Sequence, residues 1–179
     1  MLRPGLHREG IMAKADDFNG SINQALYFSR LLAEQAQALR QEAGDAAFAR
    51  QRSLCFSEAS LDALYRALVF LVLAELQRAG VATSQNPRLP EELVQELDAA
   101  NRLHPTPMLG RLRHALQSPE PLHAMLQAWR ELWLARAAQQ PVGQDILHRS
   151  QGLSPEDCQQ WREQITALIA SAQEQGAEY

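Results

Sequence analysis

The stretch at residues 67–74 reads ALVFLVLA and contains no polar residue. A helix that is apolar on every side must be covered by other elements, so this run predicts a buried central helix. A buried strand is the alternative, because short apolar runs are ambiguous by periodicity alone. The flanks favour a helix, since no Gly or Pro interrupts residues 48–79 and Gly80 follows where a helix would end.

A membrane-spanning helix is the other alternative for this run. Spanning a bilayer takes about 20 apolar residues, and Arg66 and Glu75 close the run well before that length. The chain has 179 residues, of which 46% are hydrophobic, and this size suits one compact domain with a single core. The sequence therefore predicts no membrane span and an all-α, single-domain bundle of about five to six helices around the central one.

Helix signals divide the rest of the chain. A first helix is expected at residues 19–42, with Asn19 or Ser21 as its cap, and a second at 46–79. The short connection between them implies that they run antiparallel. Shorter helices are expected at 90–102, at 108–117 and after Pro121, with linkers at 81–90 and 139–152, and Ser154-Pro-Glu-Asp157 predicts the start of the last helix.

The first residues look like an extension of this domain. Residues 1–15 contain Pro4, Gly5 and Gly10 and lack the apolar stretch of a signal peptide, which predicts a cytoplasmic protein. We therefore expect residues 1–18 to form a flexible N-terminal extension and residues 19–176 to form the bundle.

Charge and cysteine content exclude several partners and sites. A net charge of −4 supplies no field toward nucleic acid, so nucleic-acid binding is disfavoured. Cys55 and Cys158 lie far apart and outside any C-x-x-C spacing, as in a protein of a reducing compartment.

Catalytic motifs are also missing. Phosphate-loop, dinucleotide and nucleophile-elbow patterns do not occur, and the single Glu-x-x-His, from Glu120 to His123, has no second copy for a di-iron site. The five histidines contain no H-x-x-x-H pair. We expect no metal and no cofactor, and the motifs give no support for enzymatic activity.

Two groups of residues are candidate sites. Asn23 and Gln24, with Glu58, Tyr65 and Arg66, can form a polar spot between the first two long helices. Such a spot either fixes the register of the pair or forms a pocket for a small ligand or a reaction. Asp62 and Arg66 are spaced to form an ion pair along one helix.

The second candidate site contains the three tryptophans, Trp129, Trp133 and Trp161. They are either core residues or a surface left apolar by the bundle, for an unknown protein partner or a second copy of the chain. Protein–protein interaction or self-association is therefore the function predicted first, and a small-ligand or catalytic pocket is the alternative.

Several stretches of the chain stand out together: NQALYF at 23–28, EASLDALYRAL at 58–68, LSPE at 153–156, Trp161-Arg162 and Ala167-Leu168. This set resembles a family of small uncharacterised all-helical proteins of Pseudomonas and related gammaproteobacteria. The stretches occur in the same order and cover most of the chain, and they consist mainly of packing and capping residues. The resemblance implies a helical fold and no activity. The family has histidines on its central helix where this chain has residues such as Ala63 and Tyr65, so it implies no shared histidine chemistry.

Overall fold

The structure, a computed structural model, describes residues 6–42, 47–82, 89–137 and 153–177. Within these ranges the chain forms helices and no strand, which confirms the predicted all-α class. None of the helices in these ranges combines the length with the apolar character needed to cross a bilayer. The helices are α1 (Leu6–Glu42), α2 (Ala47–Arg78), α3 (Pro90–Leu103), α4 (Pro107–Ala115), α5 (Pro121–Ala137) and α7 (Pro155–Ala177).

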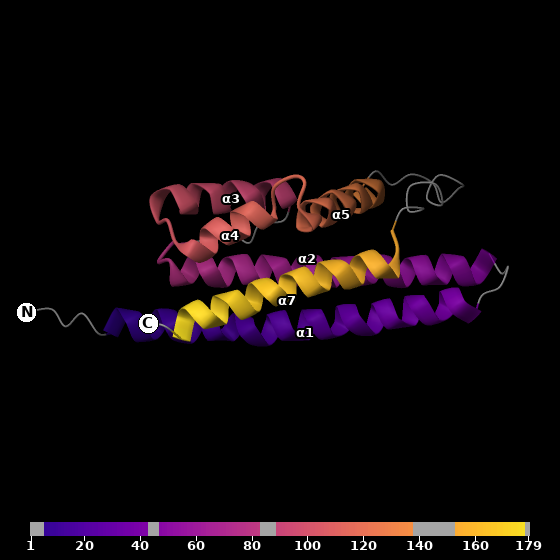
Figure 1. Ribbon diagram of the computed structural model, residues 1–179, viewed down its shortest axis with the longest axis horizontal. Coiled ribbons are helices and arrows are strands. Elements are labelled where there is room, and N and C mark those ends of the chain that lie inside the picture. Colours follow the sequence, from indigo (N-terminus) through magenta and orange to yellow (C-terminus); the bar gives the residue numbers. More distant parts are fainter. Residues whose placement is uncertain (1–5, 43–46, 83–88, 138–152, 178–179) are drawn as a thin grey trace, which may run out of the picture.

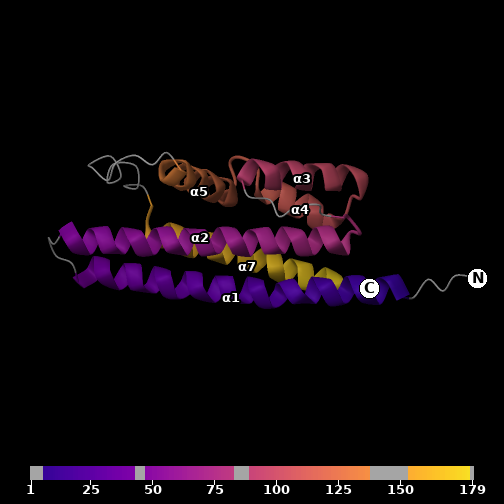
Figure 2. The same ribbon diagram turned by 180° about the vertical axis from the view of Figure 1, so that it is seen from behind.

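Helix α2 is the centre of the bundle, as its apolar run predicted. It contacts each of the other five described helices. α1 lies along one side of it, α3, α4 and α5 lie on the opposite side, and α7 runs obliquely over α1 and α2 (Figures 1 and 2). The leucines from the middle of α2 to its C-terminal end are each at most 2% exposed: Leu61, Leu64, Leu68, Leu71, Leu73 and Leu76.

Buried serines set the register of the antiparallel α1 and α2. The Ser60 hydroxyl donates to the backbone oxygen of Ser29 at 2.9 Å, and the two hydroxyl oxygens are 2.9 Å apart. Because a hydroxyl has one proton, Ser29 is the donor in this second bond. Further along the pair, the Ser53 hydroxyl donates to the backbone oxygen of Ala36 at 2.8 Å. These bonds satisfy buried polar groups in only one alignment of the two helices.

Helix α1 is longer than predicted. It begins at Leu6 instead of near Asn19, so Asn19 and Ser21 are interior helical residues and not caps. Gly20 lies inside this helix, and a side chain added there would meet nothing within 4 Å. A helical run of Met, Ala and Lys residues precedes it, and these are strong helix formers. The predicted flexibility of residues 1–18 stays a prediction.

Most helix ends follow the predicted local signals. Gly80, with a φ of 75°, ends α2, and the amide of Val81 donates to the backbone oxygen of Leu76 at 2.9 Å, as in a Schellman motif. The Ser154 hydroxyl accepts from the amide of Asp157 at 3.1 Å, and the Asp157 carboxylate accepts from the amide of Ser154 at 3.0 Å. The predicted loop at 139–152 and most of the linker at 81–90 lie outside the described residues.

Candidate functional site

The predicted polar spot between α1 and α2 is not assembled. Asn23, Gln24 and Arg66 are exposed and Glu58 is half-buried, whereas Tyr65 is 4% exposed and points away from α1. Its ring stacks on Trp129 of α5, with centroids 3.9 Å apart and an interplanar angle of 23°. The alternation of helix faces places neighbours in sequence, such as Tyr65 and Arg66, in different surroundings.

Asp62 contributes to a different contact from the one predicted. The Trp129 indole N–H donates to its carboxylate at 3.0 Å. Asp62 and Arg66 are both described, and no ion pair joins them. Trp129 needs an acceptor because its indole is buried, and Asp62 provides it at the boundary between α2 and α5.

The predicted tryptophan surface is reduced to one residue. Trp129 and Trp161 are each 6% exposed, so both pack in the core, and only Trp133 is open, at 46%. The Trp133 ring stacks on Trp129 with centroids 5.6 Å apart and an angle of 7°. Beneath them the Tyr65 hydroxyl is buried without a hydrogen-bond partner in the described structure. Burial, together with the charges of Glu92 and Glu91, raises the pKa of Tyr65.

Helix α1 carries an exposed apolar surface that was not predicted from the sequence. Tyr27 is 52% exposed, Phe28 48% and Leu31 39%, and their spacing puts all three on one side of the helix. We call this surface the α1 aromatic face. The Tyr27 and Phe28 rings are 6.1 Å apart, and the Arg30 guanidinium lies 5.4 Å from the Tyr27 ring centre. The signal was present in the sequence, because the apolar residues of α1 occupy more of its circumference than one partner helix covers.

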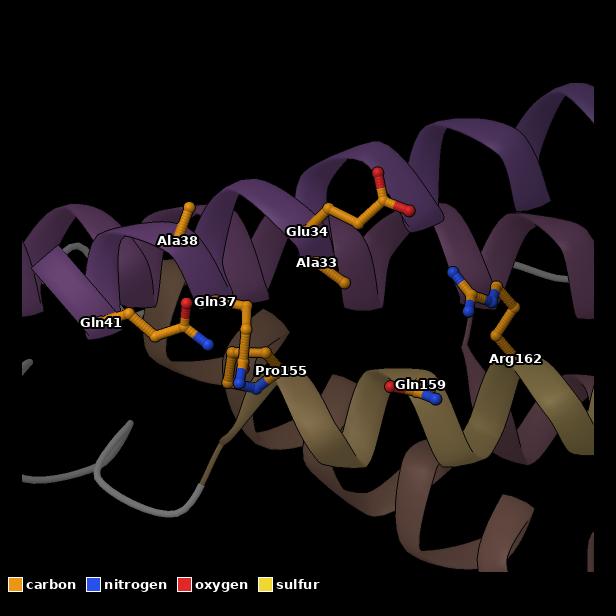
Figure 3. Close-up of a pocket in the computed structure, with 8 residues that line it drawn as sticks. All are labelled: Ala33, Glu34, Gln37, Ala38, Gln41, Pro155, Gln159 and Arg162. Carbon is orange, nitrogen blue, oxygen red and sulfur yellow. The ribbon is translucent and has the colours of Figure 1, made fainter.

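A polar groove of about 410 Å³ lies between α1 and α7. Figure 3 shows its residues facing one another from the two helices. Small or apolar groups form part of its lining, and charged and amide side chains form the rest. The lining residues are Ala33, Glu34, Gln37, Ala38, Gln41, Pro155, Gln159 and Arg162.

Among the charged side chains around this groove, one cation forms no ion pair within the described residues. Glu34 is 3.7 Å from Arg30, and Glu156 is 2.9 Å from Arg40. A backbone hydrogen bond at the N-terminus of α7, assisted by Ser154 and Arg40, lowers the pKa of Glu156, so this carboxylate is ionised and paired. No acidic side chain of the described residues forms an ion pair with Arg162. Arg162 is therefore available to an anionic group, in a groove whose other charged lining residue is Glu34.

A second groove, of about 380 Å³, lies between α3 and α5 and has a mainly apolar lining. Val94, Leu116 and Leu126 contribute to it, and an ion pair between Arg130 and Glu91 of 2.8 Å lies at its edge. Unlike the groove at α7, it contains no uncompensated charge that would select a ligand. Its shape alone does not indicate a chemistry.

Metal chemistry finds no support in the described part of the chain, where no group of three His, Cys, Asp or Glu side chains is arranged to hold an ion. Comparison with protein-family models, with curated proteins and with solved structures found no match to this chain. The family resemblance drawn from the sequence accordingly stays a prediction, and the function has to be argued from the surfaces described above.

Proposed function

We propose that this is a non-enzymatic protein that acts by self-association, and that the α1 aromatic face is its contact surface. The observation that supports this proposal is the exposure of Tyr27, Phe28 and Leu31 on one side of a helix. Burial of apolar surface contributes about 25 cal/mol per Å², so three adjoining large side chains in water favour association. Clustered apolar groups of this kind mark interaction sites more often than single ones do.

The charges beside this face favour a second copy of the chain as the partner. Arg30 and Glu34 lie four residues apart on one edge of the face, with Leu31 between them in sequence. In an antiparallel pair of identical helices, the same edges meet, so a two-fold axis near Leu32 brings Arg30 of one copy to Glu34 of the other. The edge of this surface is thus complementary to itself in charge.

Exchanging these charges between copies costs little. Within one chain the Arg30 and Glu34 side chains are 50% and 63% exposed and 3.7 Å apart. An exposed pair of this kind contributes about 0 to 1 kcal/mol. The dimer therefore replaces one weak contact within each of the two helices by two contacts across the interface.

The aromatic rings are also partly preorganised. Tyr27 lies between the Phe28 ring and the Arg30 guanidinium, which restricts its side chain before any partner arrives. Restricting an interface side chain in advance lowers the entropy lost on binding by about 0.5 to 1.5 kcal/mol per residue.

Charge reversal tests this surface. Arg30→Glu gives a chain with two acids on this edge, and Glu34→Arg gives one with two bases. Each variant alone should dimerise about tenfold more weakly or worse, because symmetry makes every repulsive contact occur twice. An equal mixture of the two should recover association as a heterodimer, which analytical ultracentrifugation measures.

Arg111→Glu, an exposed reversal on α4, is the matched control and should leave the dimer unchanged. A wild-type chain that sediments as a monomer at all concentrations would refute self-association. A dimer whose affinity is the same in both single variants and their mixture would place the interface elsewhere. Binding of a different protein by a monomer would show that the partner is not a second copy.

A further inference from the structure

The groove between α1 and α7 has the chemistry of a site for a peptide end, and this goes beyond the proposed self-association. We propose that it binds the C-terminal residues of a peptide, with the terminal carboxylate on Arg162 and the peptide groups on the glutamine amides. The groove is about 410 Å³ in volume. That volume lies in the usual range for small-ligand sites, about 300 to 1,000 Å³.

The sign of the ligand's charge follows from the charged side chains already described. Glu34 is paired with Arg30 and Glu156 with Arg40, so neither acid neutralises Arg162. Arg162 is half-buried, and its guanidinium is directed from α7 toward α1 (Figure 3). A planar guanidinium binds a carboxylate through two parallel hydrogen bonds, a geometry that a lysine does not offer. An anionic ligand with a carboxylate is therefore favoured.

The glutamine amides of the groove favour a particular chemical group next to the ligand's carboxylate. Gln37 and Gln41 project from α1 and Gln159 projects from α7, so both walls of the groove offer amide groups (Figure 3). Each primary amide has donors and an acceptor, and a peptide group likewise has one donor and one acceptor. Gln159 already donates to Glu163 at 3.0 Å, which orients its side chain. Peptide groups match this arrangement better than the apolar chain of other carboxylic acids.

The remaining lining limits the side chains of such a peptide. Ala33, Ala38 and Pro155 present only small apolar groups to the groove. Such groups offer no partner to a polar or charged side chain, so apolar side chains are favoured beside them. A peptide ending in small residues, such as alanine, fits this lining.

Isothermal titration with two matched probes tests the site. N-acetyl-Ala-Ala with a free carboxylate should bind, whereas the same peptide with a C-terminal amide should bind about tenfold more weakly or not at all. Arg162→Gln should remove this difference between the probes. Arg66→Gln, which changes an exposed arginine of α2, should retain it.

A second variant keeps the test independent of Arg162. Ala38→Leu fills the groove with a strong helix former and should weaken binding of the acid probe while circular dichroism shows an unchanged helix content. Equal binding of acid and amide probes, or an Arg162→Gln variant that behaves like Arg66→Gln, would refute the proposal. Acetate binding as tightly as the peptide acid would reduce the site to a simple anion site and also refute it. Sedimentation of the same samples reports on the dimer separately.

Discussion

The two sides of α1 reverse the usual relation between hydrophobicity and burial. Between the buried Ile22 and Leu39, the middle of the helix buries only small residues, among them Ser29 at 1% exposure and Ala36 at 0%. Toward solvent it exposes Tyr27 and Phe28, which are about half open. Large aromatic residues are ordinarily among the more buried types and serine among the exposed ones. Burial along α1 is therefore decided by the size and hydrogen bonding that α2 accepts, and not by hydrophobicity alone.

The inner side is a layer of small residues that continues to α7. Ser29 and Ser60 hydrogen-bond across α1 and α2, and the buried Cys158 of α7 donates to the backbone oxygen of Ser57 at 3.6 Å. Small side chains let helices approach closely, and their hydroxyls gain partners that large apolar residues would displace. The outer side keeps large groups accessible because nothing in the described structure covers them.

Filling the inner layer should have the largest effect. Ser60→Leu places a large side chain where Ser60 is 0% exposed and removes both bonds to Ser29. Overpacking and unsatisfied polar groups together should lower the free energy of unfolding by about 3 kcal/mol or more. Urea denaturation measures this loss. A change below about 1 kcal/mol would show that the helices separate easily and that the layer is not tightly packed.

The buried thiol should make stability depend on pH. Burial raises the pKa of Cys158 to about 11, above the value near 8.5 of an unfolded thiol. The unfolded chain then loses this proton at lower pH than the folded chain, so stability should fall as the pH rises between those two values. Cys158→Ala should remove that part of the decline.

Cys55→Ala is the matched control, because Cys55 is exposed and its removal should leave the decline unchanged. Urea denaturation at a series of alkaline pH values compares the three chains. The raised pKa of Tyr65 adds a decline that begins near pH 10, the value of an unfolded tyrosine, equally in all three chains, so their differences report the thiol alone. Identical pH profiles for wild type and Cys158→Ala would contradict the assigned burial of Cys158.

The coupling free energy between Ser29 and Ser60 should be smaller than the loss of stability caused by overpacking. Ser29→Ala and Ser60→Ala each remove one side of the same contact, so a double-mutant cycle should give a coupling of about 1 kcal/mol. Ser53→Ala, one bond along the same layer, should combine additively with Ser29→Ala, because its partner is the backbone oxygen of Ala36. Strict additivity of Ser29→Ala and Ser60→Ala would mean that the two hydroxyls do not interact.

Substitution on the outer side should have the smallest effect on stability. Leu31→Gln keeps helix propensity and exchanges a side chain that is 39% exposed, so the free energy of unfolding of the monomer should change by less than about 0.5 kcal/mol. The same variant should weaken the proposed dimer, which separates folding from association. A large loss of monomer stability would mean that Leu31 belongs to the core.

The central helix could be predicted because its hydrophobic signal lies within one short stretch and does not depend on which side of the helix faces a neighbour. A run that is apolar on all sides needs no knowledge of its neighbours to be identified as buried, and residues 67–74 behave as predicted. Helix starts at Pro90, Pro107, Pro121 and Pro155 were also close to prediction, since Pro at the first turn and nearby capping groups act within a few residues.

The candidate sites were not predictable in the same way. Asn23 and Arg66 were grouped from the antiparallel arrangement of their helices, and the structure leaves both in solvent. Tyr65 was placed toward α1 but stacks on α5. A shift of one residue in helical phase moves a side chain by about 100° around the axis, so grouping by sequence position alone does not give the face.

The amino-acid sequence by itself determined that this chain is helical, where most of its helices begin and end, and which helix lies at the centre, because propensity, capping and all-round hydrophobicity act over a few residues. Only the tertiary structure decided which side of α1 is buried, that Trp129 and Trp161 are core while Trp133 is open, and that Arg162 faces a groove without an ion pair to any acid in the described parts of the chain. These depend on how each helix is rotated against neighbours that are distant in sequence, and that rotation is set by packing between side chains from several helices at once.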